Sequence, residues 1–299
     1  MNGSAGAALP LPGVVVACVD TRLPQLALLA LQRCLRRVQP AAAVLFTDPG
    51  WQGVLPDGIT RQPAAVNSVP TYSAFMLRGL LEPVQRLAPG ATHVLVVQWD
   101  GYVVDSRAWD PQFLAYDYIG APWHDVAGDA GVGNGGFSLR SIQLLQALQD
   151  PSLAAHHPED LCICREHRAT LQQRHGIRFA PRTLAERFAY ERTVPAGPTF
   201  GFHGMFNFDR VLSAAELDAQ LRQLPDALMQ GLDGHDLCAR LIDRGDLATA
   251  RLIVDARRRL GMRDRRTWRL RARLGWSQWR QGGGAPAARG SDGGQDPHG

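Results

Sequence analysis

The sequence predicts an α/β domain, followed by a separate helical region. Two observations lead to this fold class. First, β-branched and apolar runs alternate with helical segments along most of the chain. Second, the residues after about Val211 have only helical patterns. Strands are expected at 14–19, 43–46, 93–98, 137–140 and 177–180, and helices at 24–38, 72–87, 141–148 and 158–175.

Composition suggests how the chain divides. Of the 299 residues, 45% are hydrophobic and 20% charged, which is sufficient for a packed core. We expect a flexible Gly, Ala and Pro-rich N-terminus over 1–12 and an α/β domain over 13–210. A helical region should follow over 211–280, and a low-complexity, disordered tail over 281–299. Within the helical region, Leu237–Leu260 has the spacing of one tetratricopeptide-like hairpin.

All 32 basic residues are arginines, and the formal net charge is +4. The absence of lysine excludes the P-loop, the protein-kinase site and the pyridoxal Schiff base, which require that residue. Residues 256–280 hold ten arginines against Asp264, so the rest of the chain is mildly acidic. A surface for nucleic acid is therefore not predicted. With Trp268, Trp276 and Trp279, the basic helix is either a peripheral contact for an anionic membrane or a solvated tail.

Five cysteines, odd in number and sparse, indicate reduced thiols in a bacterial-type cytoplasm. Cys162 and Cys164 lie near His156, His157 and His167, but no second cysteine pair completes the usual zinc spacing, so a zinc site is not predicted. No signal peptide or membrane-spanning run is recognised. We expect a cytoplasmic protein, at most peripheral to the inner membrane.

A glycine cluster at 131–136 raises the question of a dinucleotide site. The residues before it form a polar loop instead of the buried strand that such a site requires, which argues against this interpretation. A plain turn and a loop that contacts sugar or phosphate remain. The second is favoured, because Gly135 and Gly136 are expected to expose their N–H groups just before a short strand.

Several polar residues are candidates for chemistry. Asp100 follows the most hydrophobic strand, where open α/β sheets bind ligands, and could hold a divalent cation or simply cap a turn. Glu159 and Asp160 begin a helix, either as caps or with one acting as a general base. His203, among glycines and phenylalanines, is either a core histidine or a contact for a metal or phosphate.

These residues belong to five separated motifs, which occur in the order of a known family. They are Val96–Gly101, Tyr116–Trp123, Gly133–Arg140, Glu159-Asp160 with Phe188–Glu191, and Phe200–His203. The series, within about Val14 to Phe208, resembles the bacterial, glycosyltransferase-like domain of unknown function 5672. The resemblance implies a GT-A fold, with a Rossmann-type sheet that binds a nucleotide-sugar and has helices on both faces. The motif order is similar to that of galactosyltransferase-type enzymes.

The resemblance also implies roles for individual residues. Asp100 and His203 would bind Mn²⁺ or Mg²⁺, and Asp160 would be the catalytic base with Glu159 contacting the acceptor. The donor would contact the remaining predicted site residues, which are Asp20, Thr21, Arg22, Gln98, Gly135, Gly136 and Ser138, together with Asp100. Gln98 replaces the first acid of the common Asp-x-Asp motif.

The expected activity is transfer of a sugar from a nucleotide-diphosphate donor to an acceptor hydroxyl, with inversion, in the assembly of a bacterial glycan or glycoconjugate. One base and no evident nucleophile favour a single displacement. The alternative is a binding module that recognises a glycan or nucleotide without turnover, which the missing acid at Gln98 motivates.

Overall fold

The computed structural model describes residues 7–281. The chain forms two compact units that divide between Asn207 and Phe208, close to the boundary expected at 210. The expected flexible segment 1–12 lies outside the described residues up to position 6. The disordered tail expected over 281–299 likewise lies outside them from position 282 onward.

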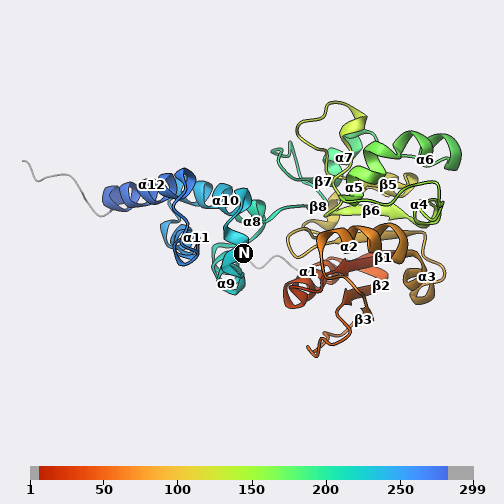
Figure 1. Ribbon diagram of the computed structural model, residues 1–299, viewed down its shortest axis with the longest axis horizontal. Helices are drawn as coiled ribbons and strands as arrows, with labels where there is room; N and C mark the ends of the chain where they lie inside the picture. Colours follow the sequence, from red (N-terminus) through yellow and green to blue (C-terminus); the bar gives the residue numbers. More distant parts are fainter. Residues whose placement is uncertain (1–6, 282–299) are drawn as a thin grey trace, which may run out of the picture. The chain divides into compact units, whose positions relative to one another are not determined.

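The first unit is built on a six-stranded sheet with the order β3-β2-β1-β4-β6-β5 (Figure 1). Its strands are β1 (Leu9–Val19), β2 (Val38–Thr47), β3 (Ile59–Pro63), β4 (His93–Val97), β5 (Tyr118–Gly120) and β6 (Ser138–Ser141). Strands β3, β2, β1 and β4 are parallel, whereas β6 runs antiparallel to both β4 and β5. The sheet is therefore mixed, and the alternation of strands and helices confirms the expected α/β class.

Strand β1 begins earlier than its apolar run indicates. Leu9, Pro10 and Leu11 already pair with β2, and the register shifts between Leu11 and Val15. Proline cannot donate to a ladder and is tolerated at such irregularities. The Pro-rich residues from Leu9 onward are thus part of the sheet, which corrects the prediction of a flexible segment reaching to residue 12.

Helices cover both faces of the sheet. Side chains alternate along a strand, so Val15, Ala17 and Val19 of β1 share one face, where they join a core with residues of α3 (Leu81–Leu87) and α4 (Ile142–Ala147). Helix α1 (Pro24–Leu35) packs against β1 and β2. None of its residues belongs to that core, so it lies on the opposite face.

Two helices expected to be continuous are interrupted by π-helical turns. The segment 72–87 is divided into α2 (Val69–Ala74), a π-helical turn at Phe75–Gly79, and α3. The segment 158–175 is divided into α5 (Glu159–Leu161), a π-helical turn at Cys162–Glu166, and α6 (Arg168–His175). A π-helical turn adds one residue to a helix and changes its apolar periodicity only slightly, so the sequence pattern does not reveal the turn. Such turns are frequent at functional sites.

Short edge elements also differ from expectation. Residues 177–180 form no strand, since Phe179 makes only an isolated bridge to Tyr118. Strands β3 and β5, helix α7 (Arg182–Phe188) and the parallel pair β7 (Ala189–Tyr190) and β8 (Gly201–Phe202) were not predicted. These elements are too short for a periodic pattern to identify them.

The second unit is helical throughout its described part, as expected. It contains α8 (Phe208–Val211), α9 (Ala214–Gln223), α10 (Leu232–Asp243), α11 (Leu247–Arg259) and α12 (Arg265–Gln281). Helices α10 and α11 pack together as a hairpin, which begins at Leu232, before the segment Leu237–Leu260 that was predicted for it. Arg257, only 1% exposed, donates to the carbonyls of Met229 and Gln230 over 2.6 and 3.0 Å. No helix among residues 7–281 combines the length and apolar character needed to cross a membrane.

Candidate functional site

Three segments meet at one edge of the sheet because of its strand directions. Strands β1 and β4 are parallel neighbours, with Cys18 opposite Val97, so the residues that follow them emerge side by side. Strand β6 runs the other way, with Ser138 opposite Val96, so the residues that precede it reach the same edge. The carboxyl edge of a parallel sheet is where open α/β proteins bind ligands.

A cavity of about 360 Å³ lies at this edge. Its size is within the range of small-molecule sites. The residues that line it come from six places in the chain. They lie at the end of β1, around the start of α2, after β4, before β6, at the start of α5 and after β8. These are Val19, Asp20, Thr21, Arg22, Val66, Ser68, Val69, Tyr72, Gln98, Trp99, Asn134, Gly135, Gly136, Pro158, Glu159, Asp160 and His203. The structure thus brings together most of the predicted site residues, with the exceptions of Asp100 and Ser138.

The glycine loop is a packing element. A Cβ on Gly135 would come within 2.7 Å of Glu159 Oε1, and one on Gly136 within 2.1 Å of His203 Nε2. Both N–H groups have partners, because Gly135 donates to Asp160 Oδ2 over 3.3 Å and Gly136 to Asn134 Oδ1 over 3.1 Å. The expectation that these N–H groups are exposed was wrong. The glycines allow the acids and the histidine to approach the loop closely.

A buried ion pair lies beneath this loop. Arg140 is fully buried, and its guanidinium donates to Glu159 Oε1 over 3.0 Å and to the carbonyl of Gly135 over 3.3 Å. Ser138 is also fully buried, donating to the carbonyl of Gly135 and accepting from Arg140. Removing one partner of such a pair leaves an uncompensated buried charge. Ser138 and Arg140 therefore hold the glycine loop in place through the carbonyl of Gly135, and Ser138 does not line the cavity.

Asp160 combines exposure to the cavity with a perturbed pKa. Its carboxylate accepts from the N–H of Leu161 over 2.8 Å and from the N–H of Gly135 over 3.3 Å. Burial and the neighbouring charge of Glu159 nevertheless raise the pKa of Asp160 above its ordinary value. A carboxyl group with a raised pKa at a cavity wall is suited to accept a proton.

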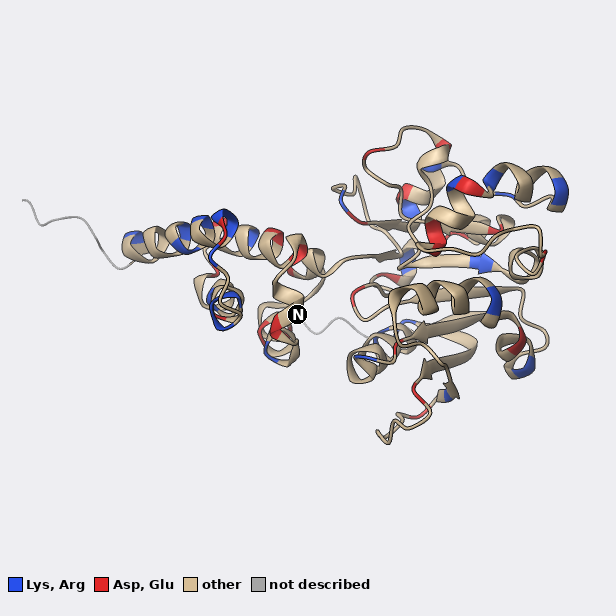
Figure 2. Cartoon of the chain, in the orientation of Figure 1, with Lys and Arg blue, Asp and Glu red and all other residues tan. Residues whose placement is uncertain are grey.

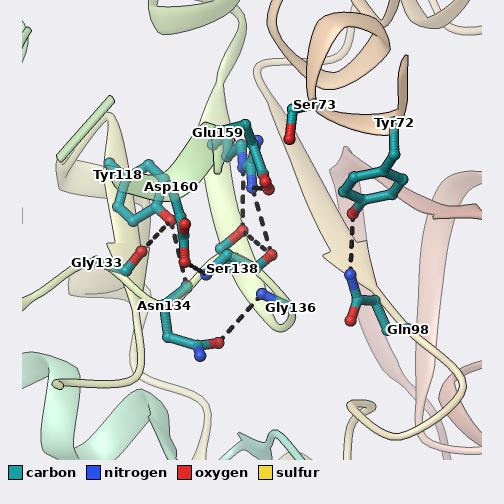
Figure 3. A network of polar contacts seen from close by, with 12 residues as sticks. Tyr72, Ser73, Gln98, Tyr118, Gly133, Asn134, Gly136, Ser138, Glu159 and Asp160 are labelled. Carbon is teal, nitrogen blue, oxygen red and sulfur yellow. Dashed lines mark hydrogen bonds and ion pairs between the residues drawn. The ribbon is translucent and has the colours of Figure 1, made fainter. Parts of the chain in front are cut away.

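His203 lies at the centre of a polar network. Its Nδ1 is 3.0 Å from Glu191 Oε1 and 3.2 Å from Asn134 Nδ2, and its Nε2 is 3.2 Å from Gln98 Oε1. Gln98 Nε2 in turn donates to the hydroxyl of Tyr72 over 3.0 Å (Figure 3). Although burial raises the pKa of Glu191, the hydrogen bond and charge of His203 lower it overall. The network links α2, the end of β4 and the residue after β8.

Asp100 lies behind this network. Its Oδ2 accepts from the N–H of Met205 over 3.2 Å, and its Oδ1 is 3.9 Å from His203 Nε2. The side chain is 11% exposed. The carboxylate thus anchors the loop after β8 while one oxygen remains directed at the histidine.

The three residues after β1 all line the cavity but differ in their contacts. Asp20 Oδ1 accepts from the N–H groups of Arg22 and Leu23 over 2.8 and 2.6 Å, which forms a turn. Thr21 donates its hydroxyl to the carbonyl of Val66 over 2.5 Å. Arg22 is exposed and contributes a positive charge to a wall that otherwise carries the carboxylates of Asp20, Glu159 and Asp160.

Sequence reasoning missed four polar residues of this site, which are Tyr72, Asn134, Arg140 and Glu191. The last three lie within the recognised motifs, next to residues that were assigned roles. Their place in those motifs is the signal that could have identified them. Tyr72 lies outside the motifs, and only the packing of α2 brings it to Gln98.

A family model described as "Protein of unknown function (DUF5672)" matches residues 59–203. The match extends from β3 through β8 and includes all five motifs, which supports the family assignment. It is narrower than the resemblance recognised over about Val14 to Phe208. No curated protein matches the chain.

Proposed function

We propose that this chain, whose residues 59–203 match the DUF5672 family, is a glycosyltransferase of GT-A type. It would transfer a sugar from a nucleotide-diphosphate donor to an acceptor hydroxyl with inversion. One observation carries the proposal. Asp160, whose pKa is raised, lines the same cavity as the segments that end β1 and β4, where an α/β sheet binds its ligand.

The proposed chemistry needs a base within reach of the acceptor. The acceptor oxygen forms a bond to the anomeric carbon of the donor as the bond from that carbon to the diphosphate oxygen breaks. The hydroxyl proton passes to the Asp160 carboxylate, whose two backbone hydrogen bonds hold it in position. The diphosphate leaves with the electron pair of the broken bond. Arg22, exposed on the cavity wall, is placed to attract its charge.

The residues around His203 fit a divalent cation. When Nδ1–H donates to Glu191, the lone pair of Nε2 faces Gln98 Oε1 at 3.2 Å and Asp100 Oδ1 at 3.9 Å. In this tautomer, a second proton on Nε2 or a bound cation would offset the repulsion among these atoms. Ligand atoms about 2.1 Å from Mg²⁺ lie about 3 Å apart along an octahedral edge. The 3.2 Å between Nε2 and Gln98 Oε1 matches this spacing, whereas Asp100 Oδ1, at 3.9 Å from Nε2, would have to move closer to bind the same ion.

Asp100 and His203, with Gln98, would therefore hold Mn²⁺ or Mg²⁺. Glu191 would orient the imidazole, as carboxylates do for metal-binding histidines. A cation bound there would neutralise charge on the leaving diphosphate.

One observation favours the alternative of a binding module without turnover. The segment Gln98-Trp99-Asp100 supplies a single carboxylate, and that carboxylate is outside the cavity lining. The same cavity could then hold a nucleotide or glycan without activating it. Binding without transfer or hydrolysis, over a panel of nucleotide-sugars, would support this alternative.

The test of the proposal compares the full chain with Asp160→Asn. Nucleotide-sugars are supplied with Mn²⁺ and candidate acceptors, and both nucleotide release and donor affinity are measured. We expect Asp160→Asn to lower turnover by about 10²–10⁴-fold, the usual contribution of a general base, with donor affinity nearly unchanged.

Asp57→Asn is the matched control, because Asp57 is exposed and outside the cavity lining. Its turnover should equal that of the unmodified chain. Full activity of Asp160→Asn would remove Asp160 from the mechanism, and absence of donor binding by the unmodified chain would remove the proposal itself.

A further inference from the structure

We propose that His156, Cys162 and His167 form a zinc site that closes the segment carrying Glu159 and Asp160. One nitrogen of each histidine and the sulfur of Cys162 lie within 4.8 Å of one another. Among residues 7–281, this is the one group of three or more His, Cys, Asp or Glu side chains that converges in this way. Imidazole nitrogen and thiolate sulfur are the ligands that zinc prefers.

The surroundings of both histidines are those of metal ligands. His167 Nε2 lies 2.8 Å from the carbonyl of Ala154, and His156 Nε2 contacts the carboxylate of Glu166. A zinc-binding histidine usually donates its second ring N–H to a carbonyl or carboxylate, which leaves the other nitrogen free for the metal. Both rings have such an acceptor at Nε2, and a ring that keeps this hydrogen bond would bind the ion through Nδ1.

Cys162 is held next to the same carbonyl. Its Sγ lies 3.4 Å from the oxygen of Ala154, and its side chain is buried, while the histidines are half-buried. Binding of Zn²⁺ would replace the thiol proton, which leaves to solvent, with a zinc–sulfur bond. Three protein ligands would leave a fourth position, which water could fill.

The two neighbouring residues of the same types lie elsewhere. The Cys164 thiol is buried beside Tyr118, and His157 Nδ1 is 3.0 Å from the hydroxyl of Ser73. Cys162 and Cys164 both lie in the π-helical turn at Cys162–Glu166, and His167, which follows this turn, contacts the carbonyl of Ala154. Sequence spacing alone does not distinguish the members of the cluster from their neighbours.

The position of the cluster suggests its role. His156 and Cys162 flank the residues 158–160, which begin α5 and carry the two acids of the cavity wall. An ion bound to both ends would restrict this short segment, and His167 would join it to the start of α6. The metal would be structural and would fix the position of Asp160, without contact with the reacting atoms.

The test measures metal binding by the full chain. Metal-free protein is titrated with Zn²⁺ in competition with a chromophoric chelator, and then with Co²⁺ to detect a thiolate–cobalt charge-transfer band. We expect a charge-transfer band and, once the cation site proposed near His203 is removed, one zinc ion per chain. Cys162→Ala should remove the band and weaken zinc binding by at least about tenfold, since even outer partners of a metal contribute 10- to 100-fold.

Three variants act as controls. Cys164→Ala keeps the cluster and should bind zinc as the unmodified chain does. Asp100→Ala removes the cation site proposed near His203, so zinc binding that persists in this variant belongs to the cluster. Glu166→Gln should weaken zinc binding while leaving all three ligands in place, which keeps the test decisive if Cys162→Ala does not fold.

The zinc site and the proposed function are tested by separate measurements, so each can be refuted without the other. Loss of glycosyl transfer activity has no bearing on zinc stoichiometry. Zinc binding should also slow hydrogen exchange at the N–H of Leu161, which donates to Asp160. No charge-transfer band, or equal zinc affinity in Cys162→Ala and Cys164→Ala, would overturn the zinc site and leave a hydrogen-bonded cluster.

Discussion

The imidazole of His203 lies so close to Gly136 that a Cβ on this glycine would come within 2.1 Å of Nε2. The contact joins the loop before β6 to the segment after β8, although 67 positions separate the two residues. It holds the ring edge against Gln98 and directs Nε2 toward Asp100. Any side chain at position 136 must therefore displace the histidine.

We expect Gly136→Ala to disrupt the site more than the fold. The added methyl group should push His203 away from Gln98 and Asp100, weakening Mn²⁺ binding. It should also lower the free energy of unfolding by about 1–3 kcal/mol, as overpacking does. Calorimetric Mn²⁺ titration and thermal unfolding would measure both effects.

The control is Gly90→Ala, because a Cβ on Gly90 meets no atom within 4 Å. Mn²⁺ affinity in this variant should be unchanged. Equal Mn²⁺ affinity in Gly136→Ala would show that the position of His203 has no bearing on cation binding.

Because the pKa of Asp160 is raised, we expect transfer activity to be lost at low pH. A base acts in its ionised form, so transfer should fall as the pH drops through this pKa. Burial and Glu159 both raise it, so removal of the Glu159 charge should lower it. Glu159→Gln should therefore shift the acid limb of the kcat profile to lower pH. An unchanged or upward shift would show that another group limits the reaction.

Glu191→Gln tests the orientation of His203. The amide cannot match the charge-assisted hydrogen bond of the carboxylate to Nδ1, so we expect Mn²⁺ affinity to fall by about 10- to 100-fold. Glu186→Gln is the matched control, since Glu186 forms a half-exposed pair with Arg182 outside the cavity. Identical Mn²⁺ affinities in the two variants would contradict the proposed role of Glu191.

We expect helix α12 to contact anionic lipid, because it exposes tryptophans and arginines. Trp268, Trp276 and Trp279 are 68%, 58% and 59% exposed, whereas Leu270 and Leu274 are buried. At 3.6 residues per turn, positions 268 and 279 are about three turns apart and lie in line, with 276 beside them. The helix carries six arginines and no acidic residue (Figure 2). Exposed tryptophans among arginines are typical of helices that lie on membranes.

Co-sedimentation of the full chain with vesicles measures this binding. We expect it on phosphatidylglycerol-containing vesicles, weaker binding at high salt, and little on purely phosphatidylcholine vesicles. Replacing the three tryptophans with alanine should reduce it at least tenfold, while Trp51→Ala, in the first unit, should not. Binding that does not depend on lipid charge, or that persists after the triple substitution, would contradict this prediction and indicate a solvated helix.

The polar site was only partly accessible from the sequence. Motif spacing indicated Asp160 and His203, and both line the cavity. It also indicated Asp100 and Ser138, but Asp100 anchors the loop at Met205, and Ser138 is buried behind the glycine loop. A motif identifies the loop in which a residue lies. The direction of the side chain depends on neighbours that are distant in the chain.

By itself the sequence determined the features that depend on local pattern. These are the alternation of strands and helices, the change to an all-helical unit near residue 208, the family motifs, and the arginine-rich final helix. Tertiary structure decided which polar groups meet. In the folded chain β6 is antiparallel to β4, which brings Gly135 to the edge of the sheet where β1 ends. The fold also brings Cys162, but not Cys164, together with two histidines. Periodicity records which face of an element is buried, whereas contacts across the fold arise only when all the elements pack together.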